Sequence, residues 1–381
     1  MHIVQVANFY GPVSGGIRTT MRELGRGYAE RGHRSTIVVP GAADSVEESA
    51  YGTVVTLGAL RVPGSGGYRV LTDVDAVCTV LQGLRPDRIE VSDRLTLRSL
   101  GRWGRAYGVP TVMWAHERVD GVLDAWLPGP WPTTWLADRW NGSTMHHFEH
   151  VVCSTSFARA ELDRIGWREV SVVPLGVDLD QFHPQRRATS VRGRHLTPDD
   201  EVLVVSVSRL SKEKRVDLTV DALRHLRASG LRARLVVAGE GPARARLERR
   251  AAGLPVTFLG HLGSRDEVAD LLAAADVVVS PGPIETFCLA ALEALASGTP
   301  VVASSGSAVG EVVGGSGGRV ADAHPIALAD AVRAVLGEDV RQRRLGARSR
   351  AEHFPWTRTV DLMLELHDRL GAPEPRLWPA A

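Results

Sequence analysis

The chain has 381 residues, of which 44% are hydrophobic and 23% are charged, and its formal net charge is +1. This length suffices for two domains of ordinary size, and the composition is typical of a globular protein. A net charge near zero gives no support for a nucleic-acid-binding protein, which usually carries a strong basic excess.

The cysteines and the first residues of the chain bear on its compartment. Cys78, Cys153 and Cys288 are far apart and odd in number, and they fit neither a disulfide framework nor a zinc spacing. The chain opens on an apolar strand pattern at 3–7 rather than on a signal peptide, and no apolar run is long enough to cross a bilayer. We therefore expect a protein of the reducing cytoplasm.

Strand and helix patterns alternate along nearly the whole chain. In the first half, strands are predicted near 2–7, 35–39, 53–57, 88–91, 110–114, 150–153 and 170–173, with helices near 17–31, 72–84, 94–107 and 155–165. In the second half, strands are predicted near 202–207, 234–238, 256–259, 276–280 and 300–303, with helices near 216–228, 242–252, 264–275 and 287–297. Ser264 followed by Glu267 is a capping box for one of these helices. The alternation predicts an α/β fold of parallel sheets covered by helices on both faces.

A polar, arginine-rich stretch at 178–200 separates the two halves. It lacks strand and helix periodicity, so we interpret it as a linker. The sequence thus predicts two Rossmann-like, doubly wound domains that face each other across a cleft, at 1–183 and 184–353. A last helix is predicted near 357–370, within a C-terminal segment, 354–381, that could return to the N-terminal domain. Ligands of such sheets bind beyond the carboxyl ends of the strands.

The first predicted strand ends in a glycine-rich turn that leads into a helix. Its paired glycines, Gly15 and Gly16, would let the backbone approach a bulky ligand closely, and the helix start would offer N–H donors. The turn lacks the dinucleotide fingerprint G-x-G-x-x-G. Taken alone, an ordinary glycine-rich connection explains it as well as a binding loop does.

Three further strand ends carry basic residues or glycines. Arg209 and Lys214 follow the strand at 202–207, where a guanidinium and an ammonium could clamp a diphosphate from two directions. A solvated basic loop is the alternative interpretation. The next two strand ends carry Gly239 and Gly241, then Gly260 and His261.

Glu285 and Glu293 flank the start of the helix predicted at 287–297. The first lies at the mouth of the helix, where free backbone N–H groups favour an anion, and the second lies about two turns inside the predicted helix. Carboxylates accept hydrogen bonds from sugar hydroxyls, so the pair suits a ligand that is part phosphate and part polyol, such as a nucleotide sugar. An acidic pair on an ordinary α/β loop is the alternative.

As a set, these motifs resemble the retaining GT-B glycosyltransferases of family 4. The resemblance rests on Ser208-Arg209-Leu210 with Lys214, on 239–242, on 258–260, on the Glu285 and Glu293 pair, on 174–178 as an inter-domain segment, and on Gly15-Gly16. The segments 7–12, 90–100 and 173–178 are similar to actinobacterial phosphatidylinositol mannoside mannosyltransferases that use GDP-mannose. One departure stands at Cys288, where the family usually has glycine.

The resemblance implies roles for individual residues. Arg209 and Lys214 would hold the donor diphosphate and stabilise it as it leaves, Glu293 would take the ribose hydroxyls, and Glu285 would contact the transferred sugar. The backbone N–H groups of Phe287 and Cys288 would face phosphate or sugar oxygens, and Gly16 would let its loop close over the donor. The full set of expected donor contacts is Gly15, Gly16, Arg209, Lys214, Gly239, Gly241, Gly260, His261, Glu285, Phe287, Cys288, Leu289 and Glu293.

The resemblance also brings His116 into the expected catalytic set, with Arg209, Lys214 and Glu285. His116 follows the strand at 110–114 and would lie near the donor sugar and the acceptor, although a lone histidine after a strand is more often packed or solvated. Breaking an anomeric C–O bond builds negative charge on the diphosphate, which basic side chains and a helix start oppose. In such retaining enzymes the departing phosphate is proposed to accept the acceptor proton.

No metal or other cofactor is expected, because basic side chains can take the place of a cation at the diphosphate. Asp73-Val74-Asp75 does match the D-x-D motif of metal-dependent transferases. It stands at the start of a helical pattern, 73–84, rather than at a strand end, which argues against a metal site there.

The acceptor is less well specified. Trp126, Trp131, Trp135 and Trp140 fall in one short segment, and tryptophans beside arginine suit a membrane interface or a lipid-head pocket, although a core or lid helix is equally compatible. Tyr10, Arg18, Arg69 and Trp126 are the candidate acceptor residues. With a lipid-linked acceptor, the enzyme would work as a peripheral protein at the inner face of the cell membrane.

Other functions stay open from the sequence. A sugar-nucleotide epimerase or hydrolase can share two facing α/β domains, but it needs further acid–base residues acting on the sugar. A non-catalytic nucleotide-binding module would not need acceptor-side residues such as His116. A family 4 transferase could also use another nucleotide sugar and a soluble acceptor.

Overall fold

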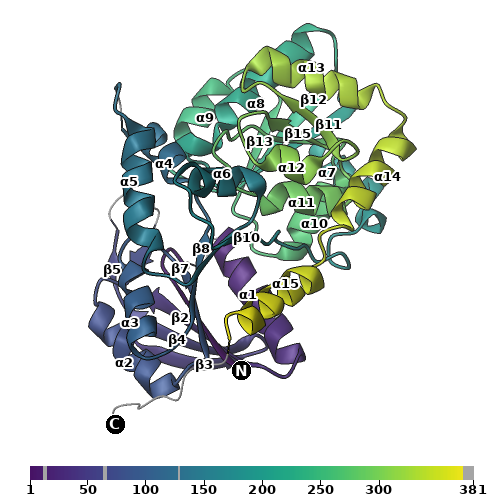
Figure 1. The fold of residues 1–381 in the computed structure, drawn as a ribbon. Coiled ribbons are helices and arrows are strands. Elements are labelled where there is room, and N and C mark those ends of the chain that lie inside the picture. The colour runs from purple at the N-terminus through teal and green to yellow at the C-terminus, as the bar shows by residue number, and fades with distance from the viewer. Residues whose placement is uncertain (12–14, 63–66, 128, 372–381) are drawn as a thin grey trace. The chain divides into compact units, whose positions relative to one another are not determined.

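A computed structural model describes residues 1–11, 15–62, 67–127 and 129–371, without the side chains of Ala125 and Trp126. The chain forms two compact units: the first comprises Met1–Leu175 and the residues from Trp356 onward, and the second comprises Gly176–Pro355. Each unit is built around its own sheet (Figure 1).

The first unit holds an eight-stranded sheet with the strand order β10-β9-β8-β7-β1-β2-β4-β3. Neighbouring strands are parallel, except that the edge strand β3 runs antiparallel to β4. Its strands are β1 (His2–Ala7), β2 (Arg34–Gly41), β3 (Ser45–Ser49), β4 (Gly52–Gly58), β7 (Arg88–Ser92), β8 (Thr111–Ala115), β9 (His150–Cys153) and β10 (Val170–Val172). A separate antiparallel ribbon joins β5 (Leu60–Arg61) to β6 (Arg69–Val70).

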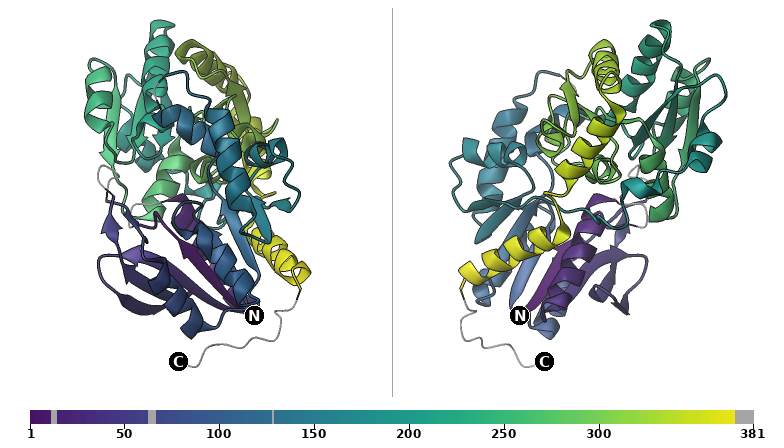
Figure 2. Two further views of the ribbon diagram at one scale, coloured as in Figure 1. Left: turned by 60° about the vertical axis from the view of Figure 1, so that its left-hand side comes forward. Right: turned by 90° about the vertical axis from the view of Figure 1, so that its right-hand side faces the viewer.

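The helices of the first unit include one from the far end of the sequence. They are α1 (Gly16–Glu30), α2 (Val74–Leu84), α3 (Leu100–Ala106), α4 (Val119–Trp126), α5 (Thr133–Met145), α6 (Ser156–Arg164) and α15 (Trp356–Arg369). Helix α15 lies beside α1, as the right-hand view of Figure 2 shows. The contact is close at Gly27, where an added Cβ atom would come within 2.4 Å of Val360 Cγ2.

The second unit is a doubly wound sheet of six parallel strands. The strands are β11 (Val202–Val207), β12 (Ala233–Ala238), β13 (Val256–Gly260), β14 (Val277–Ser280), β15 (Val301–Ser304) and β16 (Gly318–Ala321). Their spatial order is β13-β12-β11-β14-β15-β16, so the winding direction reverses between β11 and β14. Ligands of open α/β sheets bind outside the carboxyl ends of the strands at such a switch point.

Helices cover the sheet of the second unit. They are α7 (Thr189–His195), α8 (Val216–Ala228), α9 (Arg244–Arg250), α10 (Arg265–Ala274), α11 (Leu289–Ala296), α12 (Val309–Val313), α13 (Pro325–Leu336) and α14 (Val340–Ala351). Apolar residues of α8, α9 and α13 form one buried cluster with the sheet. Helices α10, α11 and α14 form a second packed group, in which α11 also contacts β14 and β15 (Figure 1). The α/β fold predicted from the alternation of strand and helix patterns is therefore confirmed.

The stretch at 178–200, which lacks helix periodicity in the sequence, nevertheless holds a 3₁₀ turn (Pro184–Arg186) and α7. It belongs to the second unit, and its arginines bind other parts of that unit. Arg187 and Arg192 each form a 2.9 Å ion pair with Asp276. The sequence did not reveal these contacts, because Asp276 lies 89 residues after Arg187 and 84 residues after Arg192.

Several predicted helices begin later than the sequence indicated, and two of them have a clear local cause. In place of a helix from 94, the carboxylate of Asp93 accepts hydrogen bonds from the backbone of Leu95 (3.1 Å) and Leu97 (2.9 Å), and helical structure starts with the 3₁₀ turn Leu97–Ser99. In place of a helix from 287, α11 begins at Leu289 because Cys288 has a left-handed backbone, with φ of 73°. Glu293 therefore lies about one turn inside the helix rather than two.

Candidate active site

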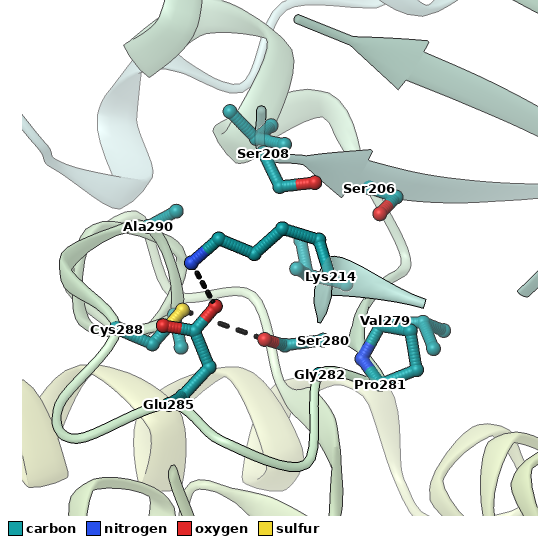
Figure 3. A pocket seen from close by; sticks show the side chains of 13 residues that line it. Ser206, Ser208, Lys214, Val279, Ser280, Pro281, Gly282, Glu285, Cys288 and Ala290 are labelled. Atoms are coloured by element: carbon teal, nitrogen blue, oxygen red, sulfur yellow. Dashed lines mark hydrogen bonds and ion pairs between the residues drawn. The ribbon is translucent and has the colours of Figure 1, made fainter. Parts of the chain in front are cut away.

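A pocket opens in the second unit where β11 and β14 end, which is the switch point of the sheet. It is lined by Ser206, Val207, Ser208, Lys214, Val278, Val279, Ser280, Pro281, Gly282, Glu285, Cys288, Ala290 and Ala291 (Figure 3). The residues come from the ends of the two strands, from the loops that follow them, and from the start of α11.

Lys214 and Glu285 provide the charged pair of this pocket. Lys214 Nζ donates a hydrogen bond to Glu285 Oε1 at 2.6 Å, and the two side chains point toward each other in Figure 3. Burial acts to lower the pKa of Lys214, but the neighbouring Glu285 carboxylate outweighs it, and the pKa is raised. Lys214 is therefore cationic at neutral pH and can bind a phosphate oxygen.

Arg209 lies on the loop after β11 but does not line the pocket. It is exposed, and its Nη2 lies 2.8 Å from Glu213 Oε1. Glu213 also accepts a hydrogen bond from Ser211 Oγ. Burial raises the pKa of Glu213, yet the hydrogen bond from Ser211 and the charge of Arg209 leave that pKa lowered overall. Both cations that the sequence predicts at the diphosphate thus have carboxylate partners.

The glycines at the neighbouring strand ends support the Arg209 loop. An added Cβ atom at Gly239, where φ is 133°, would come within 1.9 Å of Ser208 O, and one at Gly241 would come within 2.3 Å of Leu210 O. The backbone of Leu210 also makes two hydrogen bonds here. Its N–H donates to Glu240 O at 2.9 Å, and its carbonyl oxygen accepts from the Ala243 N–H at 2.8 Å. These glycines are required by chain packing, while Gly260 and the exposed His261 follow at the end of β13.

The loop that carries Glu285 is anchored on both sides. Phe287 is buried and its ring makes an edge contact with Phe354, with centroids 6.2 Å apart. The carbonyl oxygen of Glu285 accepts a 2.9 Å hydrogen bond from the Ala308 N–H. Cys288 then caps α11, and Leu289 is the first residue of that helix. The first N–H groups of a helix have no partners within it, and Glu285 lies three residues before the residue at the cap of this helix, Cys288.

Cys288 turns its thiol toward Ser280 at the end of β14. Its Sγ lies 3.4 Å from Ser280 Oγ, and Figure 3 shows the thiol beside the Glu285 carboxylate. Burial raises the pKa of this thiol to about 11, and the Glu285 charge adds to that effect. The thiol is therefore neutral at physiological pH. The left-handed backbone of Cys288, with φ of 73°, is a conformation that glycine adopts more readily than other residues.

Glu293 is buried on α11 and does not line the pocket. Its Oε1 accepts a 2.9 Å hydrogen bond from Arg265 Nη2. Burial raises the pKa of the Glu293 carboxyl, and the Arg265 charge works against that rise. Sequence reasoning missed Arg265, because an ion pair between two helices 28 residues apart leaves no periodic pattern. It also missed Glu213, although that residue lies only four positions after Arg209.

In the first unit, His116 follows β8 as predicted and contacts the end of β7. His116 Nε2 and Ser92 Oγ share a 2.9 Å hydrogen bond. The imidazole stacks on Trp114, with ring centroids 5.6 Å apart and an angle of 7° between the planes. Burial and the charge of Arg94 lower the pKa of His116 to about 4, so the ring is neutral at physiological pH.

Gly15 and Gly16 lie at the start of α1, and both are exposed. No described atom lies within 4 Å of a Cβ atom built at either position. Packing within the described part of the chain therefore does not require glycine at either position, in contrast to Gly239 and Gly241.

The candidate acceptor residues have separate surroundings. The Tyr10 hydroxyl accepts a 3.0 Å hydrogen bond from Arg22 Nε, and Arg69 Nη1 donates to Ala59 O at 2.5 Å within the β5–β6 ribbon. Arg18 is half-buried on α1. The backbone of Trp126 ends α4, but its side chain lies outside the described part of the structure.

The tryptophan-rich segment leaves two indoles exposed. Trp131 and Trp135 are 59% and 58% exposed, and the Arg139 guanidinium lies 5.9 Å from the Trp135 ring centroid. Trp140 instead packs under Arg98 at 4.8 Å. Among the described residues, no helix combines the length and the apolar character needed to cross a membrane.

The D-x-D motif sits at a helix start. Asp73 caps α2 by accepting a 3.0 Å hydrogen bond from the Ala76 N–H. Within the described ranges, no group of three or more His, Cys, Asp or Glu side chains is placed to hold a metal ion.

Comparison with known families identifies both halves of the chain. The model described as Glycosyltransferase Family 4 matches residues 14–181, and the model described as Glycosyl transferases group 1 matches residues 188–352. The chain is 52% identical over 365 residues to a GDP-mannose-dependent alpha-(1-6)-phosphatidylinositol dimannoside mannosyltransferase of Mycobacterium tuberculosis, covering 96% of this chain and 95% of that protein. It is 26% identical to a GDP-mannose-dependent alpha-mannosyltransferase of Corynebacterium glutamicum, covering 79% of this chain and 72% of the relative.

Solved structures share the fold at low sequence identity. A sucrose-phosphate synthase from Thermosynechococcus elongatus superposes with a TM-score of 0.81 at 19% identity, covering 97% of this chain and 98% of that one. Anabaena HepE in complex with UDP and glucose superposes with a TM-score of 0.75 at 17% identity, covering 96% and 99% of the two chains.

Proposed function

The chain belongs to glycosyltransferase family 4 and has the GT-B fold, and from this we propose that it transfers mannose from GDP-mannose to a phosphatidylinositol mannoside. The acceptor is the dimannoside and the new linkage is α-(1-6), as in the mycobacterial relative that matches nearly the full length of both chains. The transfer retains the configuration of the donor's anomeric carbon.

The observation that carries this proposal locally is the Lys214–Glu285 pair in the pocket at the β11–β14 switch point. In the proposed complex, Lys214 binds the diphosphate, and Glu285 accepts hydrogen bonds from the hydroxyls of the transferred mannose. As the anomeric C–O bond breaks, negative charge grows on the diphosphate, and the ammonium and the start of α11 oppose it. Losing one such partner costs on the order of 3 kcal/mol, roughly a hundredfold in rate.

The remaining contacts are proposed on the family resemblance. Arg209 exchanges Glu213 for a phosphate oxygen, and Glu293 receives the ribose hydroxyls. The first N–H groups of α11 and the preceding loop face the donor oxygens. His116, Gly15 and Gly16 of the first unit serve the same reaction. The neutral imidazole that burial imposes on His116 suits a hydrogen bond to a sugar hydroxyl rather than a charge contact.

The test is an assay with GDP-mannose, with and without phosphatidylinositol dimannoside, followed by NMR of the product. We expect mannose transfer only with the lipid and an α-anomeric product. Acceptor-independent conversion of the donor would point to an epimerase or hydrolase, and binding without turnover would point to a nucleotide-binding module. A panel of other nucleotide sugars and soluble acceptors checks both specificities.

Glu285→Gln tests the site itself. It removes the carboxylate that pairs with Lys214 while keeping the shape of the side chain, so we expect turnover to fall by roughly a hundredfold or more with little change in thermal unfolding. Glu248→Gln is the matched control, because Glu248 pairs with Arg244 on α9 and does not line the pocket. Wild-type turnover in Glu285→Gln would reject the assignment of this pocket.

We also propose that the protein meets its lipid acceptor as a peripheral protein at the inner membrane face. The exposed indoles of Trp131 and Trp135, with Arg139 beside Trp135, support this, since indoles prefer the headgroup level and arginines attract anionic lipids.

Co-sedimentation with liposomes that contain phosphatidylinositol tests the membrane proposal. We expect binding at low salt, weaker binding at high salt, and a further loss when Trp131 and Trp135 are both changed to serine. The same double change at the exposed apolar residues Val340 and Leu345 of α14 is the control. Equal sedimentation of all three proteins, or none for the wild type, would contradict the proposal.

A further inference from the structure

Arg265 occupies an electrostatically unfavourable position in its own helix. It is the first residue of α10, directly after the capping residue Ser264. A positive side chain at a helix N-terminus opposes the helix dipole, by about 0.3–1 kcal/mol at exposed sites. A residue that breaks a local rule of this kind often serves a purpose outside its own element.

The guanidinium of Arg265 is fixed by three contacts from outside α10. Its centre lies 4.9 Å from the centroid of the buried Phe182 ring, and its Nε donates a 3.1 Å hydrogen bond to Gln181 Oε1. Its Nη2 donates a 2.9 Å hydrogen bond to Glu293 Oε1. A planar guanidinium that lies against an aromatic ring and donates hydrogen bonds from two of its nitrogens is fixed in a single orientation.

The Glu293 carboxylate is buried, and Arg265 binds only one of its two oxygens. The Glu293 side chain is 11% exposed, whereas that of Arg265 is 44% exposed. Within the described part of the chain, Arg265 binds one carboxylate oxygen, Oε1, and no hydrogen-bond partner is found for Oε2. A carboxylate placed in this way keeps one oxygen for an external donor such as a hydroxyl.

We propose that Arg265 is a positioning residue that holds the Glu293 carboxylate for the two hydroxyls of the donor ribose. This inference rests on the proposed function, in which Glu293 receives that diol, and it adds a residue that the family motifs do not include. Burial alone disfavours an ionised Glu293, and the adjacent guanidinium favours the charged form, which accepts hydrogen bonds from both hydroxyls.

A purely structural role for the pair is weak by comparison. An ion pair with one partner nearly half exposed contributes about 0–1 kcal/mol to folding. The loss of Arg265 should therefore leave the fold intact and appear in ligand binding. Around metal sites, residues that orient a binding group change affinity by roughly 10- to 100-fold when removed, and we expect an effect at the lower end of that range here.

The experiment compares binding of GDP and of 2′,3′-dideoxy-GDP, measured by calorimetry, because the second nucleotide lacks the diol. We expect the wild type to bind GDP more tightly than the dideoxy nucleotide. Arg265→Ala should weaken GDP binding on the order of tenfold and leave dideoxy-GDP binding unchanged. Arg265→Lys should recover part of the loss, because its ammonium can reach Glu293 but cannot stack on Phe182 or form the fork.

Controls separate this inference from its alternatives. Arg186→Ala removes an arginine that pairs with Asp266 and Asp270 of the same helix, and it should change neither affinity. In a Glu293→Gln background, Arg265→Ala should have no further effect on GDP binding. If Arg265→Ala does not fold, Arg265→Gln is used in the same comparison.

Three results overturn the inference while the proposed function stands. The first is a loss of affinity for both nucleotides by the same factor, which would assign Arg265 a general structural role. The second is unchanged GDP binding in a folded Arg265 variant. The third is a wild type that transfers mannose but does not distinguish the two nucleotides. A wild type that binds neither nucleotide would overturn the proposed function itself, and the inference with it.

Discussion

His116 illustrates how a single side chain can be tuned by its neighbours. The ring is stacked on Trp114, shares a hydrogen bond with Ser92, and lies near the positive charge of Arg94. Because burial and that charge both disfavour the imidazolium, the pKa of the folded protein's His116 is about 4, below the ordinary 6.5. At neutral pH the residue is a hydrogen-bonding group rather than a cation.

The shift predicts a dependence of stability on pH. Because the unfolded chain binds the His116 proton at a higher pH than the folded chain does, the free energy of unfolding should fall as the pH drops from about 6.5 to about 4. His116→Gln should remove part of this fall. Urea unfolding of both proteins at pH 7 and pH 5 measures it, and an identical difference between the two pH values in both proteins would contradict the assignment.

Cys288 is a position where comparison of motifs could not predict the backbone conformation or the direction of the side chain. The resemblance to family 4 implies a glycine there, and it leaves open whether the cysteine side chain crowds the donor. In the structure Cys288 has a φ of 73°, which glycine adopts more readily, and its thiol contacts Ser280. A backbone conformation of this kind costs a non-glycine residue roughly 1–2 kcal/mol, so the cysteine is retained at some expense in stability.

The loops at the edge of the second sheet differ from the loop before α1 in what their glycines do. Gly239 is required because an added Cβ atom would collide with Ser208 O, whereas no described atom lies within 4 Å of a Cβ atom built at Gly16. Gly239 is therefore needed for the packing of the protein itself, and we propose that Gly16 leaves space for the ligand.

A pair of alanine substitutions separates these roles. Gly239→Ala should destabilise the protein by about 1–3 kcal/mol, through its φ of 133° and the clash with the Arg209 loop. Gly16→Ala should leave the unfolding midpoint unchanged or slightly higher, because alanine loses less entropy on folding, yet lower kcat/KM for GDP-mannose. Denaturation and steady-state kinetics measure both. Full activity in Gly16→Ala would remove this glycine from the proposed donor contacts.

The sequence could predict the strands and the edge where the site lies, because both follow from short-range patterns. Apolar runs mark β11–β15, and parallel strands bring their carboxyl ends to one edge, which gathers Lys214 and Glu285. The contacts that fix side chains within the site could not be predicted. Arg265 and Glu293 are 28 residues apart on different helices, and Arg187 finds Asp276 across 89 residues. Such pairs depend on the folded arrangement of elements.

The molecule as a whole is not divided as the order of its sequence suggests. The second unit, Gly176–Pro355, is inserted between two parts of the first, because α15 rejoins the sheet that begins at Met1. Buried polar contacts attach α15 to the rest of the first unit. The Glu90 carboxylate of β7 accepts hydrogen bonds from Tyr28 of α1 at 2.5 Å, from Trp114 of β8 at 3.3 Å and from His367 of α15 at 2.8 Å.

This network makes α15 part of the first unit's core. Glu90 is 2% exposed and His367 is fully buried. Burial and the Glu90 charge raise the pKa of Tyr28 well above its usual value, so the phenol stays protonated and remains a donor. Removing one donor would leave the remaining two to support a buried carboxylate.

His367→Ala should therefore destabilise the first unit by about 3 kcal/mol, through a cavity and a partly unpaired Glu90. GDP binding to the second unit should be unchanged at temperatures where the protein is folded, because Lys214, Glu285 and Glu293 belong to the other core. Calorimetric unfolding and nucleotide titration measure the two effects. His33→Ala is the control, because His33 lies near the same end of the unit but contacts the chain's amino terminus rather than Glu90. Equal stability of His367→Ala and His33→Ala would mean that apolar packing against α1, and not the Glu90 network, holds α15 in place.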